Sequence, residues 1–297
     1  MKQIANSDRN GSIDYLRFIS AIGIVWFHTH APGKTLAYTA LPCFIAIMAL
    51  YGIKPGRLKE AAHRRATRLL GPWLKWSLVY TVASIVINLK RGEPPFDWFE
   101  WAMVAYGPWI HLWFLPFAFF VGVLLAPLLD MTAKSTRKRN LALSGILGIT
   151  LILILFGPDA ASTPISQWIF GIETLGVCLP LFFSTGSKIA RFALSTSAGL
   201  MILVWHSTSS STDATAVGLG VFSALVANKL KISSSKASLA CSKLSLHIYL
   251  VHPLLIFIGY WFELTGTFLG LMSVTSSVIV ALIIEGAHSK ARTIFNQ

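Results

Sequence analysis

Long apolar runs recur along this chain from one end to the other, and they set its pattern of hydrophobic and polar positions. Each run is about 17–22 residues long, which is the length an α-helix needs to cross a bilayer. Charged residues gather in the short gaps between the runs, as is typical of a polytopic membrane protein. The pattern predicts ten spans, at residues 13–31, 36–53, 70–89, 109–129, 141–157, 165–186, 189–206, 214–231, 243–263 and 266–285.

The composition excludes a soluble globular protein. Of the 297 residues, 54% are hydrophobic and 12% are charged, whereas a soluble domain carries about 25% charged residues. No gap between spans is long enough for a soluble domain. We therefore expect an all-α bundle of about ten transmembrane helices that forms one integral-membrane domain over residues 1–297.

The basic residues orient the predicted bundle. With the N-terminus inside, 20 of the 25 Lys and Arg residues lie on one face and three lie on the other, which favours cytoplasmic N- and C-termini. The formal charge of +13 is explained by this asymmetry, so no nucleic-acid partner is expected. The longest outer loop, about residues 90–108, is rich in aromatic residues that are typical of a membrane interface: Trp98, Phe99, Trp101 and the adjoining Trp109.

Ionisable residues inside a span are candidates for function, because they are costly at bilayer depth. Arg17 and His28 are 11 residues apart in the first span, which corresponds to about 16 Å of helix rise and nearly the same face. His28 has the ordinary pKa of a general base at neutral pH, and Arg17 could hold an anion or polarise a carbonyl. The alternative is structural: His28 hydrogen-bonds between helices, and Arg17 pairs with Asp14.

Other polar residues are weaker candidates when each is taken alone. Glu173 lies within the sixth predicted span, His111 opens the fourth near Trp113, and His247 and His252 lie in the ninth, where Pro253 loosens the helix. The HExxH and HxxxH spacings of metal sites are absent, so no metal is expected. An inner loop is dense in basic residues, which suits phosphate binding or contact with anionic lipid headgroups: Arg57, Lys59, His63, Arg64, Arg65 and Arg68.

Four segments resemble motifs of the acyltransferase-3 family of bacterial integral-membrane acyltransferases. They are Tyr15-Leu16-Arg17 with an apolar run to His28, Arg65-x-x-Arg68 before Leu69-Leu70-Gly71-Pro72, His111-Leu112-Trp113-Phe114-Leu115, and Ser245-Leu246-His247-Ile248-Tyr249-Leu250-Val251-His252-Pro253. The matches run in order over residues 14–253. Ser242 and Leu246 replace the Gly and Tyr that are usual in the late segment, and Met48-Ala49 replaces the usual Ser-Gly near Phe44.

The resemblance implies transfer of an acyl group, commonly acetyl and sometimes succinyl, from cytoplasmic acyl-CoA to an envelope or exported carbohydrate. It implies a multi-pass protein of the bacterial inner membrane with acetyl-CoA or succinyl-CoA as co-substrate and no bound cofactor. Arg17 and His28 take the family's catalytic positions, and Arg65 and Arg68, with Arg64 beside them, take its CoA-binding motif. Candidate supporting residues are Asp14, His111, Trp113, Glu173, Tyr249 and His252.

Two other classes of function stay open at the level of sequence. In a proton-coupled transporter or flippase of an envelope precursor, Arg17, His28 and Glu173 would line a path for protons or substrate, and no covalent change would occur. In a scaffold for polysaccharide-assembly proteins, replacing His28 would have little effect. Dependence on acyl-CoA distinguishes the enzyme from both.

Overall fold

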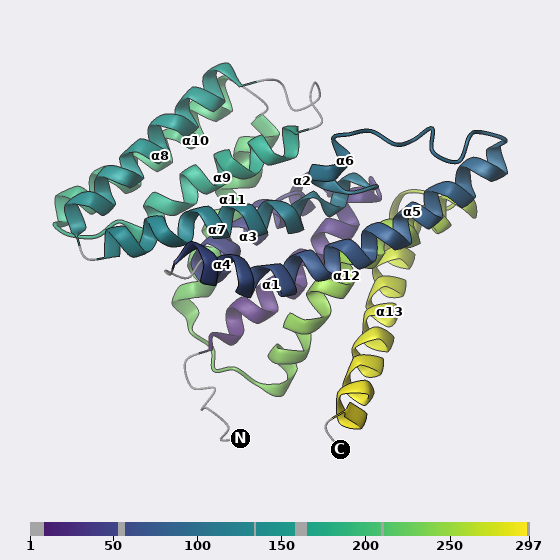
Figure 1. The fold of residues 1–297 in the computed structure, drawn as a ribbon. Coiled ribbons are helices and arrows are strands. Elements are labelled where there is room, and N and C mark those ends of the chain that lie inside the picture. Colours follow the sequence, from purple (N-terminus) through teal and green to yellow (C-terminus); the bar gives the residue numbers. More distant parts are fainter. Residues whose placement is uncertain (1–8, 53–56, 134, 158–164, 209–210, 296–297) are drawn as a thin grey trace. The chain divides into compact units, whose positions relative to one another are not determined.

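The computed structural model describes residues 9–52, 57–133, 135–157, 165–208 and 211–295 (Figure 1). These residues form helices and one isolated antiparallel bridge, between Asn10 and Ser233. The chain divides into two compact units. Unit 1 combines residues 1–47 with 210–297, and unit 2 comprises residues 48–209.

Unit 1 contains six of the described helices. They are α1 (Gly11–His28), α2 (Lys34–Ala37), α3 (Ala40–Ile47), α11 (Ser211–Leu230), α12 (Lys236–Trp261) and α13 (Gly266–Phe295). Helix α1 packs against α12 and α3, and α13 packs along α12 (Figure 1). The core is apolar, with Ala21 and Val25 of α1 facing Ile248 of α12 and Leu269 of α13. It therefore depends on contacts between the first helix and the last two.

Small residues let α11 approach α3 closely. A Cβ added at Gly220 would lie 2.7 Å from the carbonyl oxygen of Thr39 and 2.8 Å from the backbone nitrogen of Cys43. Close approach through glycine is a common way for helices to associate in membranes, where burial of apolar surface supplies little driving force. This contact accounts for the Gly- and Ala-rich composition of residues 214–231.

One end of unit 1 is formed by residues that are far apart in the sequence. The Asn10 side chain caps α1 by accepting a hydrogen bond from the Ser12 amide at 3.0 Å, and its Nδ2 donates to the carbonyl of Ala227. The Gly11 amide donates to the carbonyl of Ile232 at 2.8 Å. The start of α1 therefore lies beside the loop between α11 and α12, as the predicted order of spans requires.

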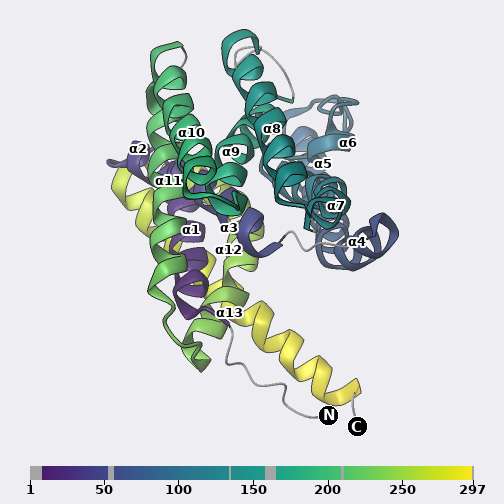
Figure 2. The same cartoon turned by 90° about the vertical axis from the view of Figure 1, so that its left-hand side faces the viewer.

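Unit 2 begins with a π-helix and contains a long continuous helical segment. Its elements are η2 (Met48–Gly52), α4 (Leu58–Arg65), the π-helix η3 (Ala66–Leu70), α5 (Gly71–Arg91), α6 (Met103–Tyr106), the 3₁₀ turn η4 (Ile110–Trp113), α7 (Phe114–Ala133), α8 (Thr136–Phe156), α9 (Ser166–Phe183) and α10 (Lys188–Thr208). Helix α7 packs on α4 and η3, and α8, α9 and α10 pack side by side (Figure 2).

The segment after α5, which the sequence predicts to be the longest outer loop, packs on that helix. It folds back along α5: Asn88 Nδ2 donates to the carbonyl of Pro94 at 3.0 Å, and Trp109 Nε1 donates to Ser84 Oγ at 2.9 Å. The sequence could not indicate this, because aromatic residues are equally typical of a membrane interface and of a packed loop.

Within the described residues, eight helical segments are long and apolar enough to cross a membrane, fewer than the ten predicted. They are Lys34–Gly52, Leu58–Arg91, Ile110–Ala133, Thr136–Phe156, Ser166–Phe183, Lys188–Ser207, Lys236–Trp261 and Gly266–Ala287. The other two predicted spans, 13–31 and 214–231, form α1 and α11 but fall short of this criterion. Asp14 and Arg17 make α1 more polar, and small residues make α11 less hydrophobic. The chain is thus an all-α polytopic membrane protein.

Candidate functional site

A pair of stacked imidazoles joins α1 to α12. His28 is the last residue of α1, and its ring lies on that of His252 with centroids 5.4 Å apart and planes inclined by 26°. His252 is fully buried, whereas His28 is exposed. The pair therefore has one accessible ring, which a reactant could reach, and one ring fixed inside the unit.

The tautomer of His252 follows from the sequence around it. Its Nδ1 lies 2.7 Å from the carbonyl oxygen of Tyr249, and because a carbonyl only accepts, Nδ1 carries the proton. In a regular helix that carbonyl would receive the amide of residue 253, but Pro253 has no N–H. The His252 side chain thus donates to a carbonyl that the following proline leaves free. In the neutral ring, Nε2 is then the basic nitrogen.

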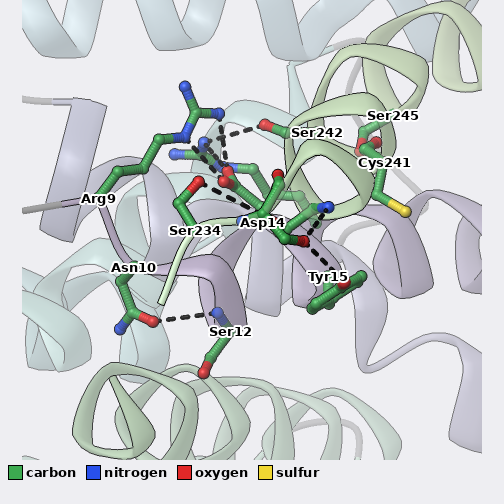
Figure 3. Close-up of polar contacts among 12 residues, drawn as sticks. Arg9, Asn10, Ser12, Asp14, Tyr15, Ser234, Cys241, Ser242 and Ser245 are labelled. Carbon is green, nitrogen blue, oxygen red and sulfur yellow. Dashed lines mark hydrogen bonds and ion pairs between the residues drawn. The ribbon is translucent and has the colours of Figure 1, made fainter. Parts of the chain in front are cut away.

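A second cluster, here called the α1 ion cluster, lies at the start of α1 and consists of Arg9, Asp14 and Arg17. Figure 3 shows the contact between Arg9 and Asp14. Arg9 donates to both carboxylate oxygens of Asp14, at 2.7 and 2.9 Å, and this hydrogen bonding raises the pKa of Arg9 above its ordinary value. Arg17 Nη1 lies 3.6 Å from Asp14 and 3.5 Å from Ser242 Oγ on α12. The Asp14 side chain is only 2% exposed. Two guanidinium groups around one buried carboxylate leave a net positive charge.

The α1 ion cluster is well separated from the imidazole pair. Eleven residues of helix place Arg17 about 16 Å along α1 from His28. The two residues therefore cannot contact the same carbonyl group. Of the two roles considered for Arg17, binding an anion is compatible with chemistry at His28, and polarising the carbonyl that reacts there is not.

A third polar contact ties α12 to α13. Lys243 Nζ lies 3.0 Å from one carboxylate oxygen of Glu285, and His247 Nε2 lies 3.7 Å from the other. The Lys243 side chain is 57% exposed, so the ion pair contributes little to stability. His247 thus faces Glu285 of α13, whereas His252 faces His28.

The basic residues of the predicted inner loop have different surroundings in the structure. Arg65 hydrogen-bonds through Nη1 to the carbonyl of Gly52 and through Nη2 to that of Ala118, which links the end of η2 to α7. Its guanidinium lies against Gly122, where an added Cβ would collide with it. Arg64 and Arg68 are exposed. Arg65 therefore links η2 to α7 within unit 2, whereas the exposed guanidinium groups of Arg64 and Arg68 are available to a ligand.

The other predicted supporting residues are buried in unit 2. The His111 ring packs edge-on against that of Tyr80, with ring centroids 4.7 Å apart, and lies near Trp109. The Trp113 ring packs on that of Phe117, with ring centroids 5.1 Å apart. Glu173 is 8% exposed within α9. Asp14, Arg17, His28, Tyr249 and His252 all belong to unit 1, in the α1 ion cluster and the imidazole pair.

The comparisons with known proteins identify the family. The family model of the acyltransferase-3 acyltransferase domain matches residues 10–286, nearly the whole chain. The chain belongs to the acyltransferase-3 family. No curated protein and no solved structure matches it. The chain is thus a membrane acyltransferase, as the four motifs of the sequence predicted.

Several residues that the structure places at these polar clusters escaped prediction from sequence. Arg9 counted only as an orienting charge, and Ser242 only as a departure from the family motif, yet Arg9 belongs to the α1 ion cluster and Ser242 contacts it. Gly122 gave no signal, because a glycine in an apolar helix is common in membranes. The His-Pro pair at residues 252–253 was visible, since a proline inside a helix always frees the carbonyl four residues earlier.

Proposed function

We propose that this acyltransferase moves an acyl group, acetyl or succinyl, from cytoplasmic acyl-CoA to a hydroxyl of a cell-envelope or exported polysaccharide or glycolipid. The observation that supports the chemistry best is the imidazole pair, because it combines an accessible ring with a buried ring of defined tautomer. The protein would act in the bacterial inner membrane, together with polysaccharide-assembly proteins.

In the proposed reaction, a ring nitrogen of His28 accepts the proton of the acceptor hydroxyl as its oxygen attacks the thioester carbonyl. The carbon–sulfur bond breaks, and the CoA sulfur leaves as a thiol after taking that proton from the imidazolium. His252 is a positioning residue here. Its buried ring fixes the plane of His28, and the Tyr249 carbonyl fixes the plane of His252.

The positive groups suit the polyanionic co-substrate. The α1 ion cluster carries a net positive charge on the side predicted to be cytoplasmic, and Arg17 keeps 24% of its side chain exposed. Arg64 and Arg68 are exposed on the segment predicted to face the same side. Guanidinium groups bind phosphates through charge-assisted, often bidentate hydrogen bonds. We assign Arg64 and Arg68 to the CoA phosphates and give Arg65 a structural role.

Mass spectrometry of envelope and exported glycans tests this function. We would compare the wild type, a deletion strain, and deletion strains that carry His28→Ala or the matched control His30→Asn. His30 is also exposed, lies two residues away, and has a positive φ of 54° that Asn tolerates. A base-labile acyl ester should disappear in the deletion and fall at least about 100-fold with His28→Ala, while His30→Asn keeps it.

The outcome that contradicts the proposal is equally definite. Glycans that are identical in all four strains, with every variant present in the membrane by immunoblot, would exclude glycan acylation. Loss of export of an unmodified glycan in the deletion strain would instead favour the transporter or flippase.

A further inference from the structure

Unit 2 contains a pocket that the proposed transfer step does not use. It has a volume of about 550 Å³ and lies between the first half of α5 and the segment that folds back along it. This size is within the range of small-molecule sites, about 300–1,000 Å³. Its lining includes Trp73, Ser77, Thr81, Phe96, Trp98 and Phe99.

The two walls of the pocket have different chemistry. On α5, Ser77 and Thr81 follow Trp73 at intervals of four residues, so one helical stripe presents hydroxyl groups beside an indole. The opposite wall is aromatic. Trp98 donates its Nε1–H to the carbonyl of Pro95 at 2.8 Å and packs edge-on to Phe99, which fixes its ring. The pocket thus offers flat apolar faces opposite hydrogen-bonding groups.

The charges around the pocket restrict the ligand further. Among the residues that the structure describes, no charged side chain lines the pocket, so a phosphate or carboxylate bound there would lack a counter-charge from them. Three exposed carboxylates, Glu93, Asp97 and Glu100, alternate with the aromatic residues of the same segment. The Lys and Arg residues of α5 are exposed and do not line the pocket: Lys75, Lys90 and Arg91.

We propose that this aromatic pocket binds an uncharged sugar unit of the acceptor glycan. A sugar ring has an apolar C–H face that packs on an aromatic ring, and hydroxyls that exchange hydrogen bonds with Ser, Thr and carboxylate groups. A lipid chain would favour aliphatic walls, yet among the described lining residues only Met103, Val104 and Pro108 supply aliphatic side chains, against four aromatic ones. CoA would bring phosphates into an uncharged site. That the sugar belongs to the acceptor rests on the proposed function, whereas its binding here rests on the pocket.

Isothermal titration calorimetry tests the proposal on full-length protein in a detergent without a sugar headgroup. The probes are neutral tetrasaccharides of glucose, galactose and mannose, an oligogalacturonate of the same length, and acetyl-CoA. We expect at least one neutral tetrasaccharide to bind, the uronate to bind more weakly, and acetyl-CoA not to compete. Trp98→Ala should weaken binding about tenfold, which corresponds to about 1.4 kcal/mol and is within the range for the loss of one aromatic contact.

Trp101→Ala is the matched control, because Trp101 belongs to the same segment, is 83% exposed, and does not line the pocket. Phe99→Leu keeps the apolar volume and removes the flat face, so it tests the same contact if Trp98→Ala does not fold. The proposal is overturned if no neutral probe binds, if Trp98→Ala and Trp101→Ala weaken binding equally, or if acetyl-CoA displaces the sugar.

His28→Ala separates this proposal from the proposed function. The variant should bind the tetrasaccharide as the wild type does, because His28 belongs to unit 1 and does not line the pocket. Sugar binding without any glycan acylation in cells would refute the transfer function and leave the pocket in place. Glycan acylation without sugar binding would refute the pocket alone.

Discussion

Replacing Pro253 by alanine should make the protein more stable and less active. The change restores a backbone N–H that can donate to the carbonyl of Tyr249, where His252 Nδ1 now donates at 2.7 Å. A proline in a helix interior costs about 3 kcal/mol relative to alanine, so the free energy of unfolding should rise by up to that amount. The side chain of His252 then loses the acceptor that fixes its tautomer.

The magnitude of the loss follows from that hydrogen bond. A net contribution of about 0.5–1.5 kcal/mol corresponds to a two- to twelvefold change in the population of the Nδ1–H tautomer. We expect acyl transfer to fall by about that factor, measured as CoA release by purified protein with a saturating acceptor. Thermal unfolding of the same preparations measures the gain in stability.

A second proline provides the control. Pro127 lies inside α7, and Pro127→Ala should also raise stability while acyl transfer stays at the wild-type rate. The reasoning is refuted if Pro253→Ala is stabilised and fully active, because the tautomer of His252 would then not matter. It is also refuted if both variants lose activity equally, because rigidity rather than the imidazole pair would be responsible.

Three further changes test the other polar contacts. Gly122→Ala should displace the guanidinium of Arg65 and lower the free energy of unfolding by about 1–3 kcal/mol. Gly145→Ala is the control and should not lower it, because a Cβ added there meets nothing within 4 Å. Equal unfolding midpoints of the two variants would disprove the contact. Arg68→Ala should raise the KM for acyl-CoA at an unchanged unfolding midpoint, and an unchanged KM would remove it from the CoA site. Asp14→Asn should lower the free energy of unfolding by about 1–3 kcal/mol, because the guanidinium groups of the α1 ion cluster would then repel each other. An unfolding midpoint equal to that of the wild type would contradict this.

The helices could be predicted well from the sequence, and their contacts could not. Apolar runs of membrane-spanning length depend on local composition, so the helices formed close to where the pattern placed them. The return of residues 92–109 along α5 depends on individual bonds, such as Trp109 to Ser84. Such bonds join residues 25 positions apart, and neither spacing nor hydropathy indicates them.

The same is true of the candidate site: its first residues could be predicted from the sequence, and their contacts could not. Arg17 and His28 were identified because charged and titratable groups are costly in a span. Their contacts with Ser242 and His252 were not predicted, because both of these residues lie on a helix more than 200 residues later in the chain. The charge of Arg65 was evident from the sequence, but its surroundings were not. Only the structure shows that backbone carbonyls occupy two of its nitrogens.

The contacts of α1 also bear on how many helices cross the membrane. Arg17 lies beside Ser242 of α12, and His28 lies beside His252, so both helices run in the same direction over corresponding lengths. Because α12 belongs to a segment that is apolar enough to span a bilayer, a helix parallel to it over this length must cross the same layer. The paired carboxylate of Asp14 reduces the cost of placing Arg17 there. We infer that α1 spans the membrane beside α12. The two helices are the first and ninth of the ten predicted spans, and because successive spans alternate in direction, the first and the ninth must run the same way.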